Sequence, residues 1–133
     1  MSPRVVALIV ATLAPQVAFA QAWQAPAAAV ARLGVQAMAC QGEFCLGVGC
    51  RFGRAELISI SPGGGPFNGA AAVEVGARKA RVVFTVDPAF MTELGVLGTR
   101  APVEASVLAA LAQAKAIAVS GSTFSEKRLA RFA

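Results

Sequence analysis

Three cysteines in one short segment are the residues of this chain whose spacing most clearly indicates chemistry. Cys40, Cys45 and Cys50 follow one another at intervals of five, and they are the only cysteines present. Neighbouring thiols can form a disulfide, bind a metal ion or act as redox groups. If residues 41–44 form a hairpin loop, Cys40 and Cys45 lie opposite each other, with Cα atoms ~4.5–5.5 Å apart. That separation suits a disulfide.

The pairing remains open, because Cys40–Cys50 is also feasible and either bridge leaves one thiol over. Cys50 shares a strand face with Leu46 and Val48, so we expect a buried thiol if it is unpaired. An intermolecular or reactive thiol is the alternative. A metal site would need a fourth ligand, and the redox spacing C-x-x-C is absent. We therefore expect a structural disulfide, no metal and no cofactor.

The chain contains no histidine and no tyrosine. This absence removes Ser-His-Asp and Cys-His machinery and imidazole general bases. Its seven carboxylates form no recognisable catalytic pair. We therefore predict no catalytic residue. The alternative is a small envelope hydrolase whose carboxylates converge in a cleft.

Basic residues form three groups along the chain. One is Arg51 with Arg54, one lies at an expected hairpin tip, and one lies near the end of the chain. The candidate residues for binding an anionic surface are Arg78, Lys79, Arg81, Lys127, Arg128 and Arg131. An ordinary solvated surface is the alternative. Nucleic acid is not expected, because few aromatic residues are available for base stacking.

The first twenty residues have the three parts of a secretory signal peptide. Residues 1–4 carry one positive charge, residues 5–14 are apolar, and Ala18 and Ala20 fit a small-x-small cleavage site. We expect residues 1–20 to be removed, leaving residues 21–133 as one small β-rich domain with 11 basic and 7 acidic residues. An apolar run of ten is too short to span a bilayer, so residues 5–14 are not expected to be a membrane anchor. No membrane span is expected in the mature chain either.

Alternating apolar residues predict strands over residues 35–40, 44–51 and 54–61. Residues 70–75 and 80–87 predict a hairpin with its turn at residues 76–79. Residues 90–100 contain two glycines and are expected to form a loop or a short helical turn.

The last third combines helix and strand signals. Pro102 and Glu104 suggest the start of a helix that extends to Lys115, and residues 116–119 follow as a strand. Thr123 and Glu126 have capping-box spacing, which predicts a terminal helix. Together these elements predict a mainly β to α+β fold: an antiparallel β-sandwich-like sheet of about six or seven strands with one or two helices packed against it. We expect Trp23 to fill the edge of the core.

Several segments also resemble a known family. They are Trp23, the cysteine-containing strand, residues 107–121 and residues 124–133. In these segments the chain resembles small exported proteobacterial proteins of the invasion-associated locus B type. The resemblance covers about half of the expected domain, and the later cysteine pair of that family is missing here. It implies a compact β-sandwich-like domain without known catalysis.

These patterns favour a periplasmic or secreted bacterial protein. The leading hypothesis is a non-enzymatic binding or interaction module of the cell envelope. Its expected partner is an envelope component or another exported protein. The alternatives are the carboxylate hydrolase and a purely structural or stress-related accessory protein.

Overall fold

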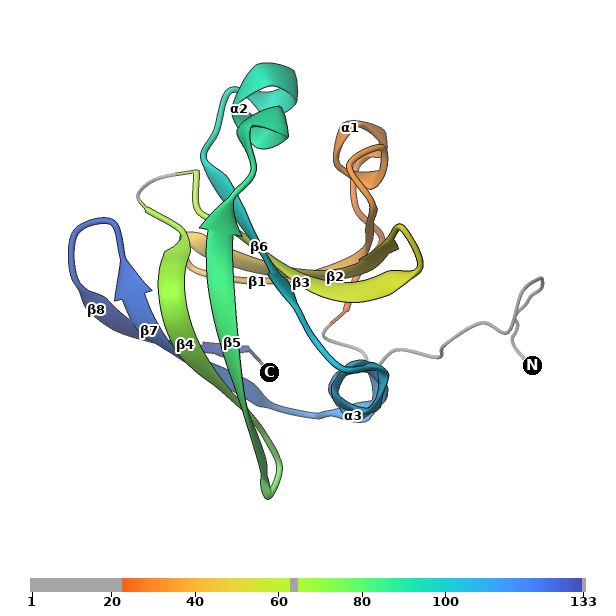
Figure 1. Cartoon of the computed structure of the whole chain (residues 1–133), viewed down its shortest axis with the longest axis vertical. Helices are drawn as coiled ribbons and strands as arrows, with labels where there is room; N and C mark the ends of the chain where they lie inside the picture. Colours follow the sequence, from red (N-terminus) through yellow and green to blue (C-terminus); the bar gives the residue numbers. More distant parts are fainter. Residues whose placement is uncertain (1–22, 63–64, 133) are drawn as a thin grey trace.

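The computed structural model describes residues 23–62 and 65–132. The expected signal peptide lies outside these residues. Within them, the chain forms eight strands and three short helices (Figure 1). In chain order the elements are α1 (Ala28–Ala31), β1 (Val35–Gln41), β2 (Phe44–Arg51), β3 (Arg54–Ile60), β4 (Phe67–Val75), β5 (Arg78–Val86), α2 (Pro88–Leu94), β6 (Gly98–Pro102), α3 (Ala105–Gln113), β7 (Ile117–Thr123) and β8 (Lys127–Phe132).

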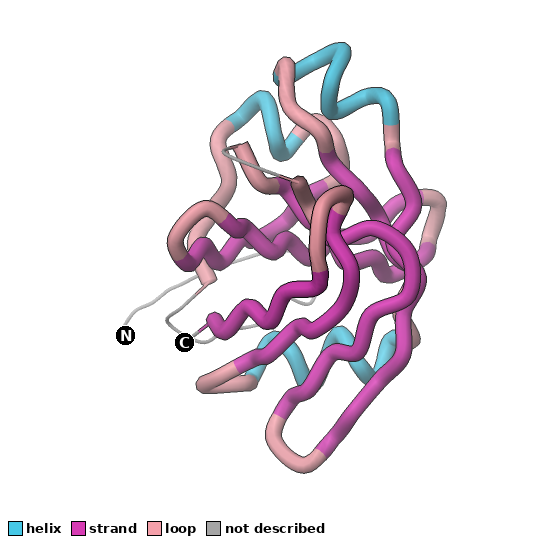
Figure 2. The backbone as a smooth tube through the Cα atoms, turned by 90° about the vertical axis from the view of Figure 1, so that its left-hand side faces the viewer, coloured by secondary structure: helices cyan, strands magenta, loops and turns pink. Residues whose placement is uncertain are grey.

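All eight strands belong to one antiparallel sheet in the order β1-β2-β3-β6-β5-β4-β7-β8. The sheet curls strongly, so that β1–β3 cross the direction of β4, β5, β7 and β8 (Figures 1 and 2). The curl brings the outer strands β1 and β8 into contact. The side chain of Arg128 in β8 reaches the β1–β2 turn, where it pairs with Glu43 at 3.7 Å. The result is a half-barrel.

The predicted class, mainly β to α+β, is confirmed. The sheet has eight strands rather than six or seven, however, and it forms one curled layer instead of a sandwich. The two strands that the sequence did not indicate are β6 and β8. Curling allows a single sheet to cover its own apolar face, so no second sheet is required.

The main core lies inside the curl. It contains large buried side chains from several strands, which are Phe67, Phe84, Leu46, Leu57, Val48, Val73 and Val119. Helix α3 lies at one end of the half-barrel, while α1 and α2 lie at the other (Figure 2). Trp23 is buried in this core, and its Nε1 donates a hydrogen bond to the Leu111 carbonyl of α3 at 3.1 Å. Trp23 therefore takes the expected structural position.

A second, smaller core lies on the outer face of β1–β3. Val35, Ile58 and Ile60 are buried there together with Phe90 of α2, and Val30 and Leu33 from α1 and the turn after it pack against them. Strand β3 is consequently buried on both faces from Glu56 to its end. This outer core gives the two short helices their packing surface.

Residues 90–100 were expected to form a loop or a short helical turn because they contain two glycines. Helix α2 supplies the helical turn as far as Leu94, but residues 98–102 form strand β6. Gly98, its first residue, faces the ring of Phe90, and a Cβ at this position would overlap that ring. A glycine inside a strand that marks the close approach of another group is a known pattern. Gly98 therefore allows α2 to pack onto β6 rather than interrupting the strand.

The expected terminal helix is wrong, because residues 127–132 form β8 and pair with β7. Thr123 does bond to nearby backbone groups, as its spacing with Glu126 suggested. Its Oγ1 accepts hydrogen bonds from the Ser125 and Glu126 N–H groups and donates to the Glu126 carbonyl. These bonds close a hairpin turn, since Thr side chains stabilise turns as well as helix starts.

The expected helix start at Pro102 is also wrong. Pro102 ends β6, where it pairs with Glu56, and α3 begins at Ala105. The β4–β5 hairpin is confirmed, with Gly76 and Ala77 between the strands.

The structure contains a Cys40–Cys45 disulfide, which was the first of the two pairings considered. The two cysteines are directly opposite on β1 and β2, with Cα atoms 4.0 Å apart. Cys50 is free but exposed, so the expected burial is wrong. It is the second-to-last residue of β2 and lies beyond the part of the strand that the core covers.

This arrangement predicts one alkylatable thiol in the folded, non-reduced protein. Iodoacetamide should label Cys50 quickly without denaturant, because its thiol is exposed. Peptide mass spectrometry should then recover Cys40 and Cys45 in one bridged peptide. Labelling of all three cysteines would contradict the disulfide.

The close approach at Gly98 predicts that Gly98→Ala lowers the free energy of unfolding by about 2 kcal/mol, as overpacking of a core commonly does. Urea denaturation measures the change. The double variant with Phe90→Leu should lose less than the sum of the two single variants, because removing the ring makes room for the methyl group. Additive effects would show that the two positions do not interact.

Candidate functional site

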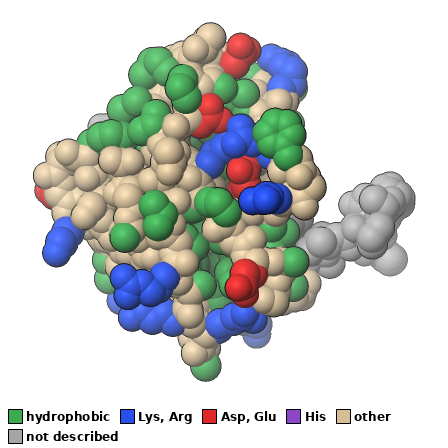
Figure 3. All heavy atoms as spheres, viewed as in Figure 1, with side chains coloured by type: hydrophobic (Ala, Val, Ile, Leu, Met, Phe, Trp, Pro, Cys, Tyr) green, Lys and Arg blue, Asp and Glu red, His purple; other side chains and the backbone are tan. Residues whose placement is uncertain are grey.

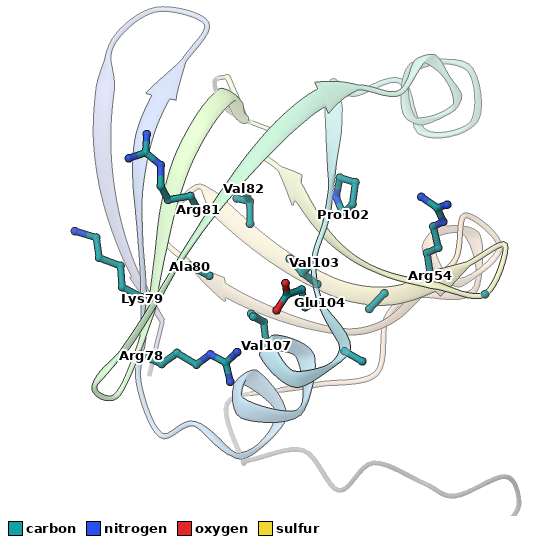
Figure 4. Close-up of a pocket in the computed structure, with 13 residues that line it drawn as sticks. Arg54, Arg78, Lys79, Ala80, Arg81, Val82, Pro102, Val103, Glu104 and Val107 are labelled. Carbon is teal, nitrogen blue, oxygen red and sulfur yellow. The ribbon is translucent and has the colours of Figure 1, made fainter.

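A cleft opens where β5 separates from β6. The two strands pair only at Thr85 with Arg100 and at Val86 with Thr99. Below that point β5 diverges, and α3 lies across the bottom of the opening (Figure 4). The cleft has a volume of ≈ 620 Å³. Its apolar floor includes Ala80, Val82, Val103 and Val107.

Four basic residues and one acidic residue line the cleft. The basic ones are Arg54, Arg78, Lys79 and Arg81, and the acidic one is Glu104. Figure 4 shows Arg54 on the β3 side, the other three on β5, and Glu104 between the two walls. Positive charge around a low-dielectric hollow concentrates the electrostatic field and attracts anions.

The three predicted residues of β5 do not point the same way. Arg78 extends toward α3, where its Nη2 donates a hydrogen bond to Ser106 Oγ at 2.9 Å. Lys79 and Arg81 extend away from α3, on the outer side of the strand (Figure 4). Lys79 forms an exposed ion pair with Glu74 at 3.7 Å. Arg81 makes no hydrogen bond or ion pair with any residue that the structure describes.

The predicted basic residues of the chain end lie on β8, away from this cleft. Arg128 pairs with Glu43 and Glu126 and stacks over the Phe44 ring at 4.9 Å. Lys127 is exposed, and Arg131 lines a different hollow beside Lys115. The six predicted residues therefore form two separate groups, of which only the β5 group borders the cleft.

Sequence reasoning did not assign Arg54 and Glu104 to the β5 group. They lie 24 and 26 positions from Arg78, on the far wall and at the base of the cleft. The only sequence signal that bears on Arg54 is the predicted hairpin of β2 and β3, which places this residue at the start of β3. No local pattern indicates that β3 and β5 flank the same opening.

A buried ion cluster holds the upper end of the cleft. Arg100 is only 5% exposed, and its guanidinium contacts three separate segments. Nε donates to Asp87 Oδ2 at 2.6 Å, Nη1 donates to Glu56 Oε1 at 3.0 Å, and Nη2 donates to the Leu33 carbonyl. The guanidinium also lies 4.9 Å from the Phe90 ring centre. Arg100 therefore ties β3, β5 and the turn after α1 to β6.

Arg51 adds a second cation to the same carboxylates. It lies 3.3 Å from Asp87 Oδ2 and 3.4 Å from Glu56 Oε2. Asp87 also caps α2, because its Oδ1 accepts a hydrogen bond from the Ala89 N–H at 3.0 Å. In the view of Figure 1, the space-filling picture shows acidic and basic side chains next to one another near the middle of the molecule (Figure 3).

The electrostatics of the cluster keep Asp87 ionised. Burial by itself raises the pKa of this carboxyl, but hydrogen bonds from Arg100 and the Ala89 N–H oppose it. Together with the charges of Arg100 and Arg51, they hold the pKa below its usual value. A general acid needs a raised pKa, so the lowered pKa suits Asp87 to holding structure rather than to donating protons.

Residues 23–62 and 65–132 contain no group of three or more His, Cys, Asp or Glu side chains that could hold a metal ion. In the same ranges, no helix combines the length and apolar character needed to cross a bilayer.

No protein-family model, curated protein or solved structure matches this chain. The resemblance to the invasion-associated locus B type therefore stays a prediction.

The depressed pKa of Asp87 predicts a pH-dependent contribution to stability. A carboxyl with a lowered folded-state pKa stabilises the fold above its unfolded pKa and loses this effect as the pH falls through the folded value. At pH 6, Asp87→Asn should cost about 2 kcal/mol, between the values for buried and exposed pairs. Asn can still cap α2.

Urea denaturation at pH 6 and pH 2.5 tests this expectation. The difference between wild type and Asp87→Asn should shrink at the lower pH. Glu93→Gln, an exposed change on α2, is the matched control and should show a small difference at both values. An equal cost of Asp87→Asn at both pH values would contradict the ionised pair.

Proposed function

We propose that this chain is an exported, non-enzymatic interaction module of the bacterial cell envelope. Its cleft between β5, β6 and α3 binds an acidic partner, either an envelope component or another exported protein. The observation that carries the proposal is the charge of the residues that line the cleft. Four are basic and one is acidic, with Arg78 directed toward α3 and with Lys79 and Arg81 on the outer side of β5.

Two of the basic side chains are available to a partner. Arg54 and Arg81 are exposed and make no hydrogen bond or ion pair with other described residues. The pair between Lys79 and Glu74 is exposed and 3.7 Å long, so it competes weakly with a bound anion. A basic rim of this kind accelerates encounters with acidic surfaces and makes binding sensitive to salt.

The proposed compartment has support from two sides. Residues 1–20 have the composition of a signal peptide, and disulfides such as Cys40–Cys45 are typical of oxidising environments. In the periplasm, the anionic headgroups and acidic proteins of the envelope would be accessible to the cleft.

The carboxylate hydrolase has less support. Two carboxylates that act together need separate protonation states and access to a substrate. Glu56 and Asp87 are both paired with Arg51 and Arg100, and Glu104 is the only carboxylate among the residues that line the cleft.

Charge reversal at Arg78, Lys79 and Arg81 tests the binding proposal. The purified residues 21–133 should co-sediment with bacterial envelope fractions at low salt, and the triple Glu variant should lose most of this retention because it reverses the charge of one cleft wall. Each exposed substitution should change the free energy of unfolding by no more than about 0.5 kcal/mol.

The matched control reverses Arg32, Lys115 and Lys127, which are exposed and form no ion pair with described residues. Both triple variants have the same net charge. Equal loss in the two would indicate a general charge effect, and full retention of the cleft variant would reject the cleft as the site.

A further inference from the structure

We propose that the partner enters the cleft as an extended peptide that adds a strand to the open edge of β5, with acidic and apolar residues alternating along it. This inference rests on the proposed function and specifies its ligand. It follows from the accessible edge of β5, from the different character of its two faces and from the position of Glu104.

The first step concerns the edge of β5. Residues 78–84 pair with β4 on one side, whereas β6 pairs only with Thr85 and Val86 on the other. Five consecutive residues, 78 to 82, line the cleft. Their side chains alternate between two faces, so a cavity that touches all five must border the edge of the strand itself.

An open edge presents backbone N–H and C=O groups to the cleft, because alternate residues of a strand direct these groups to opposite neighbours. Binding of an extended peptide to such an edge is an established mode of recognition, in which main-chain hydrogen bonds supply affinity. Along residues 78–82, which line the cleft, the edge spans about 14 Å at 3.4 Å per residue, enough to pair with the central part of a peptide of five to seven residues.

The two faces of β5 then determine the sequence of the peptide. On the outer face lie Lys79 and Arg81, with the exposed Val83 beyond them. On the inner face lie Arg78, whose Nη2 donates a hydrogen bond to Ser106 Oγ, and then Ala80, Val82 and Phe84, which pack on the main core. A neighbouring strand places its own side chains alternately beside these two sets, so acidic residues fit outside and apolar residues fit inside.

The position of Glu104 also favours apolar peptide residues on the inner face of β5. Its side chain extends into the cleft from the segment between β6 and α3 (Figure 4). A peptide carboxylate on the inner face would lie near this like charge and away from water. An apolar side chain there would instead meet Val82, Val103 and Val107. Beyond Arg78, whose guanidinium is already bonded to Ser106, the inner face therefore selects against acidic residues, and the outer face selects for them.

Binding of defined peptides to residues 21–133 tests the inference. The probe is a blocked seven-residue peptide in which Glu and Val alternate, with Glu at both ends. Two controls share its composition: one groups all Glu residues before all Val residues, and the other is N-methylated at alternate positions. We expect NMR titration to shift the amide signals of residues 78–82 with the alternating peptide.

Each control removes one element of the recognition. N-methylation removes main-chain donors, and should weaken binding by about tenfold or more because several hydrogen bonds are lost. Grouping the charges should weaken it because acidic residues then face the core side. In the protein, Lys79→Gln with Arg81→Gln should also weaken binding, whereas Lys115→Gln with Lys127→Gln should not.

The outcomes separate this inference from the proposed function. Equal binding of the N-methylated peptide would overturn strand addition. No binding of any peptide, with salt-sensitive retention on envelope fractions intact, would overturn the peptide ligand while leaving the acidic-partner proposal standing. If no peptide binds and the protein is not retained on envelope fractions, the peptide ligand and the acidic-partner proposal are both overturned. The basic residues of β5 would then serve to protect its open edge from pairing.

Discussion

The arrangement of this protein depends on the guanidinium of Arg100. Three of its nitrogens bind groups from three segments: Asp87 at the end of β5, Glu56 in β3 and the Leu33 carbonyl after α1. Arg100 and the two carboxylates are largely buried, so removing any one of them would leave a charge without its partner in a poorly hydrated place. The cluster therefore fixes where β5 meets β6. It also fixes the start of α2, through Asp87, and the turn after α1, through Leu33.

The cleft is a consequence of this single junction. Because β5 is held to β6 only near Asp87, its lower part is free to follow β4 around the curl. At the opposite end, Arg78 and Ser106 connect β5 to α3. The opening between these two connections exposes the side of a strand whose other side is fully paired. A protein usually protects such an edge, and here the charges of Lys79 and Arg81 provide both protection and a basis for recognition.

Strand β5 shows why basic residues that are neighbours in the sequence need not form one binding site in the folded protein. Arg78, Lys79 and Arg81 are near neighbours in the chain, but strand alternation directs them differently. Arg78 extends toward α3, while the other two lie on the outer face. Arg54 and Glu104 complete the cleft from β3 and from the start of α3. Strand β8, which forms in place of the expected helix, also directs its basic side chains to different places. Arg128 contacts Phe44 and Glu43, whereas Arg131 lines the second hollow.

What the sequence determined by itself is local. Alternation predicted β1, β2, β3 and the β4–β5 hairpin, because neighbouring strands joined by a short turn have few possible registers. The five-residue spacing made Cys40–Cys45 one of two feasible disulfides, and the structure contains this one. Only the tertiary structure decided the position of β6, the exposure of Cys50, the change of the last segment to a strand and the ion cluster around Arg100. These features depend on partners far apart in the chain. Arg100, Glu56 and Leu33 are separated by dozens of residues, and no local periodicity records which distant backbone or carboxylate a side chain will meet when the sheet curls.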